Sequence, residues 1–290
     1  MDNTRSVLTQ IESSLPQMTK AQRKVSEFIL DNAIDAMFLP IEKMALAAGT
    51  STSSIMRLAL MLGYTGYSDF LQALQDSVKA QFIPSERLRV NTELFGEDSL
   101  FLSFYNRNSQ ILAETFQQNS PEELAACVDL LSAAPRIFVV GSRASYAMAH
   151  YFAYQCYRLH GNCSLFDQAD ESWPEHLHDL QPGDAVLVYA FPRYPRKVVT
   201  ISKWAKELGA KIIVIADSPK APPVQYCDHV LLCATKGLGF QNAIGGISFL
   251  TEYLLTAMSF AQKDQVKQRL ASMEPLLTDG DTSMYYKKLL

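Results

Sequence analysis

The second half of the chain contains short, uninterrupted apolar runs separated by segments of helical length. Runs of this kind are typical of strands that are buried on both faces of a parallel sheet. Because strands that alternate with helices form right-handed βαβ units, the pattern predicts a doubly wound sheet of five parallel strands. The predicted strands cover residues 137–140, 163–166, 185–189, 211–216 and 229–233.

Ligands of a doubly wound sheet bind beyond the carboxyl ends of its strands. In this chain that rule selects three loops, at residues 142–145, 191–196 and 217–223. A long apolar helix at about 242–261 follows the last strand. The three loops are therefore the places where we expect side chains to meet a small molecule.

The first eighty residues follow a helical period instead. Apolar residues recur at i, i+3, i+4 and i+7 from Ile41 and again from Ile55, and Gly49 and Gly63 stand at the two expected helix ends. Two helices joined by a short turn make a helix-turn-helix, whose second helix can enter a DNA major groove. A plain helical hairpin inside a bundle fits the pattern about equally well. Residues 79–97 are predicted to be an irregular tether.

Net charge and cysteine content argue against several classes of function for this chain. A net charge of −4 argues against indiscriminate binding to nucleic acid but allows a small DNA-reading element. The five cysteines include no C-x-x-C pair, which argues against a zinc site or a disulfide framework and favours a reducing cytoplasm. No apolar run reaches the roughly 18 residues of a membrane span. The H-x-H at His176 and His178 is a weak metal motif, so we predict neither a metal nor a cofactor.

Several segments resemble a known family. Residues 22–30, 48–58 and 62–70 resemble the N-terminal module of RpiR-type bacterial transcriptional regulators. Residues 139–146 and 205–218 are similar to the sugar isomerase (SIS) domain that those regulators carry. The resemblance covers nearly the whole chain, in the domain order of the family.

The resemblance implies an α-helical helix-turn-helix bundle followed by an α/β domain of SIS type. We place the DNA-binding domain at residues 1–78, a linker and connecting helix at 79–107, and the SIS effector-sensing and oligomerisation domain at 108–290. The family implies a homodimer or homotetramer that binds a palindromic double-stranded operator and senses a metabolite, usually a phosphosugar, without catalysis. We therefore expect a cytoplasmic, metabolite-responsive transcriptional regulator that contacts no membrane.

The expected DNA-reading helix covers about 52–61. Arginine can meet a phosphate or a guanine edge, and serine hydroxyls can meet a phosphate or a base. Residues 1–80 carry seven basic side chains against eight acidic ones, and two apolar residues stand where many family members have basic ones. Because phosphate contacts dominate DNA affinity, we expect modest affinity, shape readout or dependence on dimer avidity. The candidate contacts are Lys43, Thr52, Ser53, Ser54, Met56, Arg57, Leu60, Met61 and Tyr64.

The first candidate effector loop contains Ser142, Arg143 and Ser145, between a strand and a helix start. Backbone amides at such a place point at an incoming anion, and the hydroxyl groups add donors. The matching positions in SIS domains bind the sugar or its phosphate. One of the serines could instead simply cap the helix.

The second candidate loop departs from the family pattern. SIS phosphosugar sites usually carry S-x-S-G-x-T after this strand, whereas here every such hydroxyl is absent and two prolines remove amide donors. Arg193, Tyr194 and Arg196 remain, and guanidinium groups bind carboxylate and phosphate alike. We therefore expect a small anionic metabolite, either a sugar phosphate or another carbohydrate-derived acid. Pairing of these arginines with Asp170 or Glu171 at a subunit interface is about equally consistent with the sequence.

Two functions of other classes stay open. A SIS-fold sugar-phosphate isomerase needs a placed base and acid, and no Glu/His pair stands out in the three loops. A helical interaction module with a degenerate sensor would use Leu60 and Met61 as a protein contact.

Overall fold

The computed structural model describes residues 7–94, 100–166 and 173–279. The chain forms two compact units. One contains the described residues up to Phe104 together with Leu238–Gln241, and the other contains Tyr105–Gly237 and the described residues from Asn242 onward. Asp170 and Glu171, the acidic partners considered above, lie outside the described residues.

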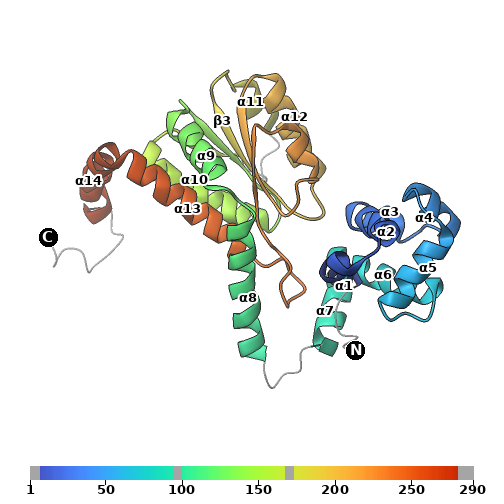
Figure 1. Cartoon of the computed structure of the whole chain (residues 1–290). Helices are drawn as coiled ribbons and strands as arrows, with labels where there is room; N and C mark the ends of the chain where they lie inside the picture. The colour runs from blue at the N-terminus through green and yellow to red at the C-terminus, as the bar shows by residue number, and fades with distance from the viewer. Residues whose placement is uncertain (1–6, 95–99, 167–172, 280–290) are drawn as a thin grey trace. The chain divides into compact units, whose positions relative to one another are not determined.

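The first unit is built from helices (Figure 1). Thr19 and Gln22 form a reciprocal capping box at the start of the second helix, because each side chain bonds the backbone N–H of the other. Gly49 and Gly63 take left-handed φ angles of 61° and 92° at the helix ends, as the sequence predicted. The helices are α1 (Val7–Ser14), η1 (Leu15–Gln17), α2 (Lys20–Asp31), α3 (Ala33–Ala36), α4 (Ile41–Ala47), α5 (Thr52–Met61), α6 (Tyr67–Phe82) and α7 (Pro84–Leu94).

A single apolar core holds this unit together. The predicted stripes from Ile41 and Ile55 do point inward, since Met44, Ile55 and Leu58 are fully buried. They pack with Val25 and Ile29 of α2 and with Phe70 and Leu74 of α6. The core thus fixes the two helices of the helix-turn-helix against their neighbours, and leaves the other face of α5 outside.

The expectation of an irregular tether at residues 79–97 is wrong for most of that segment. Helix α6 continues to Phe82, and α7 covers Pro84–Leu94. Proline is well tolerated in the first turn of a helix, where its missing N–H has no intrahelical partner. Pro84 therefore starts a helix here rather than interrupting one.

The second unit contains the predicted sheet of five parallel strands. Its strand order is β2-β1-β3-β4-β5, and each neighbouring pair is parallel. In register, Val140 of β1 lies opposite Val188 of β3, and Ala190 of β3 lies opposite Ala216 of β4. The strands are β1 (Ile137–Val140), β2 (Cys163–Leu165), β3 (Ala185–Ala190), β4 (Lys211–Ala216) and β5 (His229–Leu232).

Helices cover both faces of this sheet, as a doubly wound fold requires (Figure 1). One apolar layer joins the sheet to α9 (Pro121–Ala133), α10 (Ser145–His160) and α13 (Gly245–Ala261). The other joins it to α11 (Trp173–His178) and α12 (Arg196–Glu207). The remaining elements are α8 (Leu100–Gln117), η3 (Pro222–Tyr226) and α14 (Lys263–Asp279). Among the described residues, no helix is long and apolar enough to cross a membrane.

Candidate DNA-binding and effector sites

Helices α4 and α5, with the turn between them, form the helix-turn-helix. Ser51 is the N-cap of α5, and its hydroxyl accepts a hydrogen bond from the backbone N–H of Ser54 at 3.3 Å. The buried stripe of α5 holds the helix in place, so its opposite face is presented outward. That arrangement is the one in which a second helix can enter a major groove.

The structure sorts the predicted DNA contacts into exposed and buried groups. Two of them are buried: the Ser54 hydroxyl bonds that of Ser51 at 2.9 Å, and the Tyr64 hydroxyl donates to Gln10 Oε1 at 3.1 Å. Arg57 is exposed and lies along its own helix, with its Nε donating to the Ser53 carbonyl at 3.3 Å. The exposed members are Lys43, Thr52, Ser53, Met56, Arg57, Leu60 and Met61.

The outward face of α5 is unusually apolar for a DNA-reading helix. Leu60 is 55% exposed and Met61 is 37% exposed. On α4, Leu46 is 83% exposed. Apolar side chains can contact a thymine methyl group but neutralise no phosphate.

The two candidate effector loops follow neighbouring strands. From β1 the chain passes to β2 on one side and later to β3 on the other, so the β1/β3 boundary is the topological switch point of the sheet. Ligands of doubly wound sheets bind at this point. Arg143 follows β1 and Arg193 follows β3, and both take left-handed φ angles, of 57° and 78°. Left-handed backbone in a residue other than glycine is strained, and such strain concentrates at functional sites.

The start of α10 gives no support to a capping role for the two serines. Ala144, not a serine, is the N-cap residue, and its side chain makes no cap hydrogen bond. Just before it, Gly141 approaches the helix so closely that a Cβ atom there would lie 2.6 Å from Ala149 Cβ and 2.7 Å from the Ser145 carbonyl oxygen. The first loop therefore depends on glycine to bring the end of β1 against α10.

A buried carboxyl group lies beside the second loop. The Tyr194 hydroxyl donates a hydrogen bond of 2.8 Å to Asp217 Oδ1, at the end of β4. Burial raises the pKa of Asp217 above its ordinary value, while the Tyr194 hydrogen bond and the charge of Lys236 oppose that rise. Burial and the neighbouring carboxylate also raise the pKa of Tyr194. The carboxyl edge of the sheet thus carries an acidic group as well as the arginines.

Asp217 and Lys236 were missed as site residues by the sequence reasoning. The first could have been found, because it directly follows a predicted buried strand and stands in the third loop of the carboxyl edge. Lys236 follows β5 at a distance of several residues, and only the fold shows that its charge reaches Asp217.

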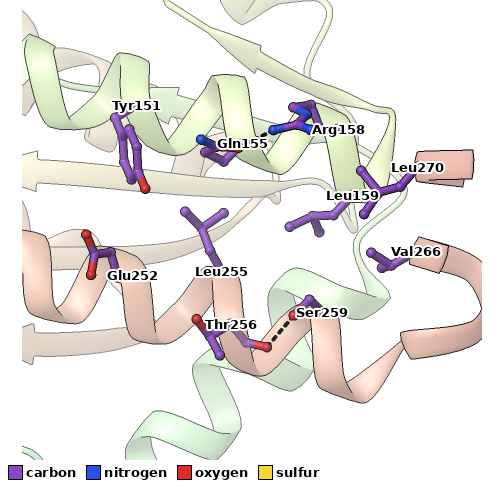
Figure 2. Close-up of a pocket in the computed structure, with 10 residues that line it drawn as sticks. All are labelled: Tyr151, Gln155, Arg158, Leu159, Glu252, Leu255, Thr256, Ser259, Val266 and Leu270. Carbon is purple, nitrogen blue, oxygen red and sulfur yellow. Dashed lines mark hydrogen bonds between the residues drawn. The ribbon is translucent and has the colours of Figure 1, made fainter. Parts of the chain in front are cut away.

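A groove of about 420 Å³ lies elsewhere, between α10, α13 and α14 (Figure 2). Arg158 and Gln155 reach into it from α10, and Glu252 and Thr256 from α13 (Figure 2). Of the described residues that line it, none belongs to the candidate effector loops. Two of these helices also carry exposed aromatic side chains: Tyr154 and Tyr157 on α10, and Phe249, Tyr253 and Phe260 on α13.

Comparisons with known proteins agree with this two-part architecture. A family model for the helix-turn-helix domain of the rpiR family matches residues 5–81, and one for the SIS domain matches residues 130–250. The HTH-type transcriptional regulator YfhH of Escherichia coli K12 is 23% identical over 278 residues, 93% of this chain and 98% of its own length. HexR of Pseudomonas aeruginosa, also an HTH-type transcriptional regulator, is 27% identical over 228 residues, 77% of this chain and 78% of HexR.

A solved structure extends the likeness to the fold. NanR of Vibrio vulnificus, in complex with ManNAc-6P, matches with a TM-score of 0.57 and 20% identity over 93% of this chain and 98% of NanR. A helix-turn-helix domain followed by a SIS domain defines a class of DNA-binding transcriptional regulators. This chain belongs to the RpiR family of that class. It is a regulator, like its curated relatives, rather than one of the isomerases that share the SIS fold.

Proposed function

We propose that this regulator senses a small anionic metabolite at the carboxyl edge of its sheet, and that a sugar phosphate is the first class to test. The observation that carries the proposal is the pair of strained arginines, Arg143 and Arg193, which follow the two strands of the switch point. Guanidinium groups bind phosphate and carboxylate through paired hydrogen bonds. NanR, which has the same fold, was solved with the phosphosugar ManNAc-6P.

The proposed effector contacts are those of the two loops: Ser142, Arg143, Ser145, Arg193, Tyr194 and Arg196. Asp217 joins them, because its carboxyl group accepts the Tyr194 hydroxyl at the same edge. In the second loop, two arginines and a tyrosine then replace the hydroxyl-rich phosphate cradle that is usual in the family. The carboxyl group of Asp217 suits a ligand that also carries hydroxyl groups.

The proposed DNA contacts are the exposed residues of α5 and Lys43 of α4. Arg57 would meet a phosphate or a guanine edge, and Thr52 and Ser53 would meet phosphates at the amino end of the helix. We place this DNA-binding activity in the cytoplasm, where a bacterial operator is found.

We also propose that the protein acts as a homo-oligomer. Two helix-turn-helix units in a symmetric dimer match the two half-sites of a palindromic operator, about one helical turn apart. The exposed aromatic residues of α10 and α13 offer an apolar face for a second copy. An effector that binds one dimer arrangement better than the other would shift the spacing of the two DNA-reading helices.

The test combines ligand binding and DNA binding on the full-length protein. A thermal-shift panel would compare sugar phosphates with sugar acids, other organic acids and amino acids. The expected result is stabilisation by one phosphorylated or carboxylated sugar class, and a change in promoter DNA binding with the same compound. Stabilisation without any change in DNA binding, or turnover of a sugar phosphate, would contradict the proposal.

A further inference from the structure

A cluster of three metal-ligating side chains lies at the opposite edge of the sheet from the effector loops. Glu123, Cys127 and His229 bring a carboxylate oxygen, a sulfur and an imidazole nitrogen to within 4.8 Å of one another. His229 is the first residue of β5, whereas the effector loops follow the carboxyl ends of their strands. Because the strands are parallel, the cluster is separate from the proposed effector site.

Local structure explains why these side chains converge. Glu123 and Cys127 are four residues apart on α9, so they lie on one face of that helix. Helix α9 packs against β5, where His229 points toward it. Asp228, the residue before His229, points away from the cluster and accepts hydrogen bonds from Lys206 Nζ and from the backbone N–H of Ile212.

The separation of Glu123 and His229 matches that of two ligands in a tetrahedral zinc site. Glu123 Oε1 lies 3.2 Å from His229 Nδ1 and accepts the backbone N–H of Val230, also at 3.2 Å. Zinc binds histidine nitrogen and carboxylate oxygen at about 2.0 Å, which places two such ligands about 3.3 Å apart in a tetrahedron. The observed separation therefore needs almost no rearrangement for both atoms to share one ion.

The three side chains of the cluster differ in their exposure to solvent. Cys127 is fully buried, while the side chains of His229 and Glu123 are 26% and 37% exposed. An ion can thus enter from the side of the histidine and the carboxylate and reach the thiol behind them.

We propose that Glu123, Cys127 and His229 form a binding site for a zinc-type divalent cation, with a water molecule in the fourth position. Nitrogen, sulfur and a carboxylate oxygen together select a borderline-soft metal over Mg²⁺ or Ca²⁺, which require oxygen ligands. The ion would tie α9 to the amino end of β5, 106 residues apart in the chain. The sequence argued against zinc because it contains no C-x-x-C pair and only a weak H-x-H motif, whereas this site is assembled from two distant segments.

The test uses Co²⁺ as a spectroscopic substitute for Zn²⁺ in the full-length protein after removal of metal by a chelator. One equivalent of Co²⁺ is expected to give a thiolate-to-metal charge-transfer band and the visible bands of a tetrahedral site, and Zn²⁺ is expected to displace it. Cys127→Ala should abolish the charge-transfer band. Glu123→Gln and His229→Gln should each weaken Zn²⁺ binding at least tenfold, since loss even of groups that only orient ligands costs about that much.

Matched controls separate this site from others in the chain. Cys156→Ala removes another buried thiol, on α10, and His178→Gln removes an exposed histidine, on α11; neither should alter the Co²⁺ spectrum. Cys127→Ala is a small change. If that variant nevertheless fails to fold, Glu123→Gln and His229→Gln still test the site, because both side chains are partly exposed. A protein that gives no charge-transfer band, or a band that survives Cys127→Ala and His229→Gln, would overturn the proposal. In that case Glu123 and His229 form only a hydrogen-bonded pair between α9 and β5.

Discussion

At the scale of single residues, the candidate effector loops carry arginine at two positions where the backbone conformation favours glycine. Arg143 and Arg193 both adopt left-handed backbone, which costs a residue with a Cβ atom about 1 kcal/mol relative to glycine. Backbone strain alone would favour glycine at both positions. The two guanidinium groups thus stand at these positions in spite of the backbone strain. This is consistent with a role in binding.

Replacing Arg193 with glycine separates binding from folding. Arg193→Gly relieves the left-handed strain, and this offsets the extra entropy of glycine in the unfolded chain, so stability should stay within about 1 kcal/mol of the wild type. The thermal shift produced by the effector should be lost. Urea denaturation and the ligand panel measure the two effects. Lys203→Gly, in the interior of α12, is the matched control and should lose about 1 kcal/mol while keeping the ligand response.

Asp217 gives the structure a dependence on pH. Burial raises its pKa in the folded state above the ordinary value of 3.8, so its favourable contribution is present when it is protonated and is lost as the pH rises through the folded pKa. Asp217→Asn resembles the protonated form and can still accept the Tyr194 hydroxyl. The variant should be more stable than the wild type at about pH 7, and the difference should vanish below about pH 4. Urea denaturation at the two pH values tests this, and equal stability at about pH 7 would contradict it.

The residues of the two sites were predictable to different degrees. Arg143 and Arg193 could be chosen from the sequence because they directly follow buried apolar runs. The burial of Ser54 and Tyr64 could not, because it depends on a cap hydroxyl and on Gln10 of a separate helix. The Glu123–Cys127–His229 cluster depends wholly on the packing of α9 against β5.

At the scale of elements, the outward face of α5 carries little positive charge for the DNA contact proposed for it. Its exposed Leu60 and Met61 neutralise no phosphate, and Arg57 is its only basic residue. A helix of this kind depends on apolar and shape contacts for much of its affinity. Adding a positive charge at these positions should therefore change binding in a measurable way.

Substituting lysine on this face tests whether α5 meets the duplex. Leu60→Lys or Met61→Lys should tighten promoter binding at low salt and steepen the plot of log affinity against log salt by about 0.9 for each new phosphate contact. Titrations at several salt concentrations measure the slope. Gln72→Lys, at an exposed position of α6, is the matched control and should leave it nearly unchanged. An unchanged slope in both α5 variants would place this face against protein rather than DNA.

The elements themselves were largely predictable, for a physical reason. β1 and β4 begin and end where the sequence predicted, because a strand buried on both faces must be apolar throughout and is bounded by polar turns. The segment 84–94 was not predictable in the same way, since it has neither an apolar stripe nor a strong breaker after Pro84. Its helix is decided by the favourable position of proline in the first turn.

At the scale of the whole molecule, the homo-oligomer proposed above would bring two helix-turn-helix units to one operator. One helix-turn-helix unit with few basic residues gives little affinity by itself. Joining two units makes the second contact intramolecular, which raises affinity without any new contact. The strength of DNA binding should therefore depend on the interface between copies as much as on α5.

The exposed aromatic face of the SIS unit provides a direct test of this dependence. Tyr154 of α10 is 56% exposed and Tyr253 of α13 is 39% exposed. The double variant Tyr154→Glu/Tyr253→Glu places like charges on that face in each copy, so analytical ultracentrifugation should show a monomer. Promoter affinity should then fall by about a hundredfold or more, because avidity is lost while α5 is unchanged.

The matched control is Trp204→Glu, at an exposed aromatic position of α12 on the other face of the sheet. This variant should keep both the oligomer and the affinity. A double variant that stays oligomeric would place the interface on another face, and a monomer that binds the promoter as tightly as the wild type would refute the dependence on avidity itself.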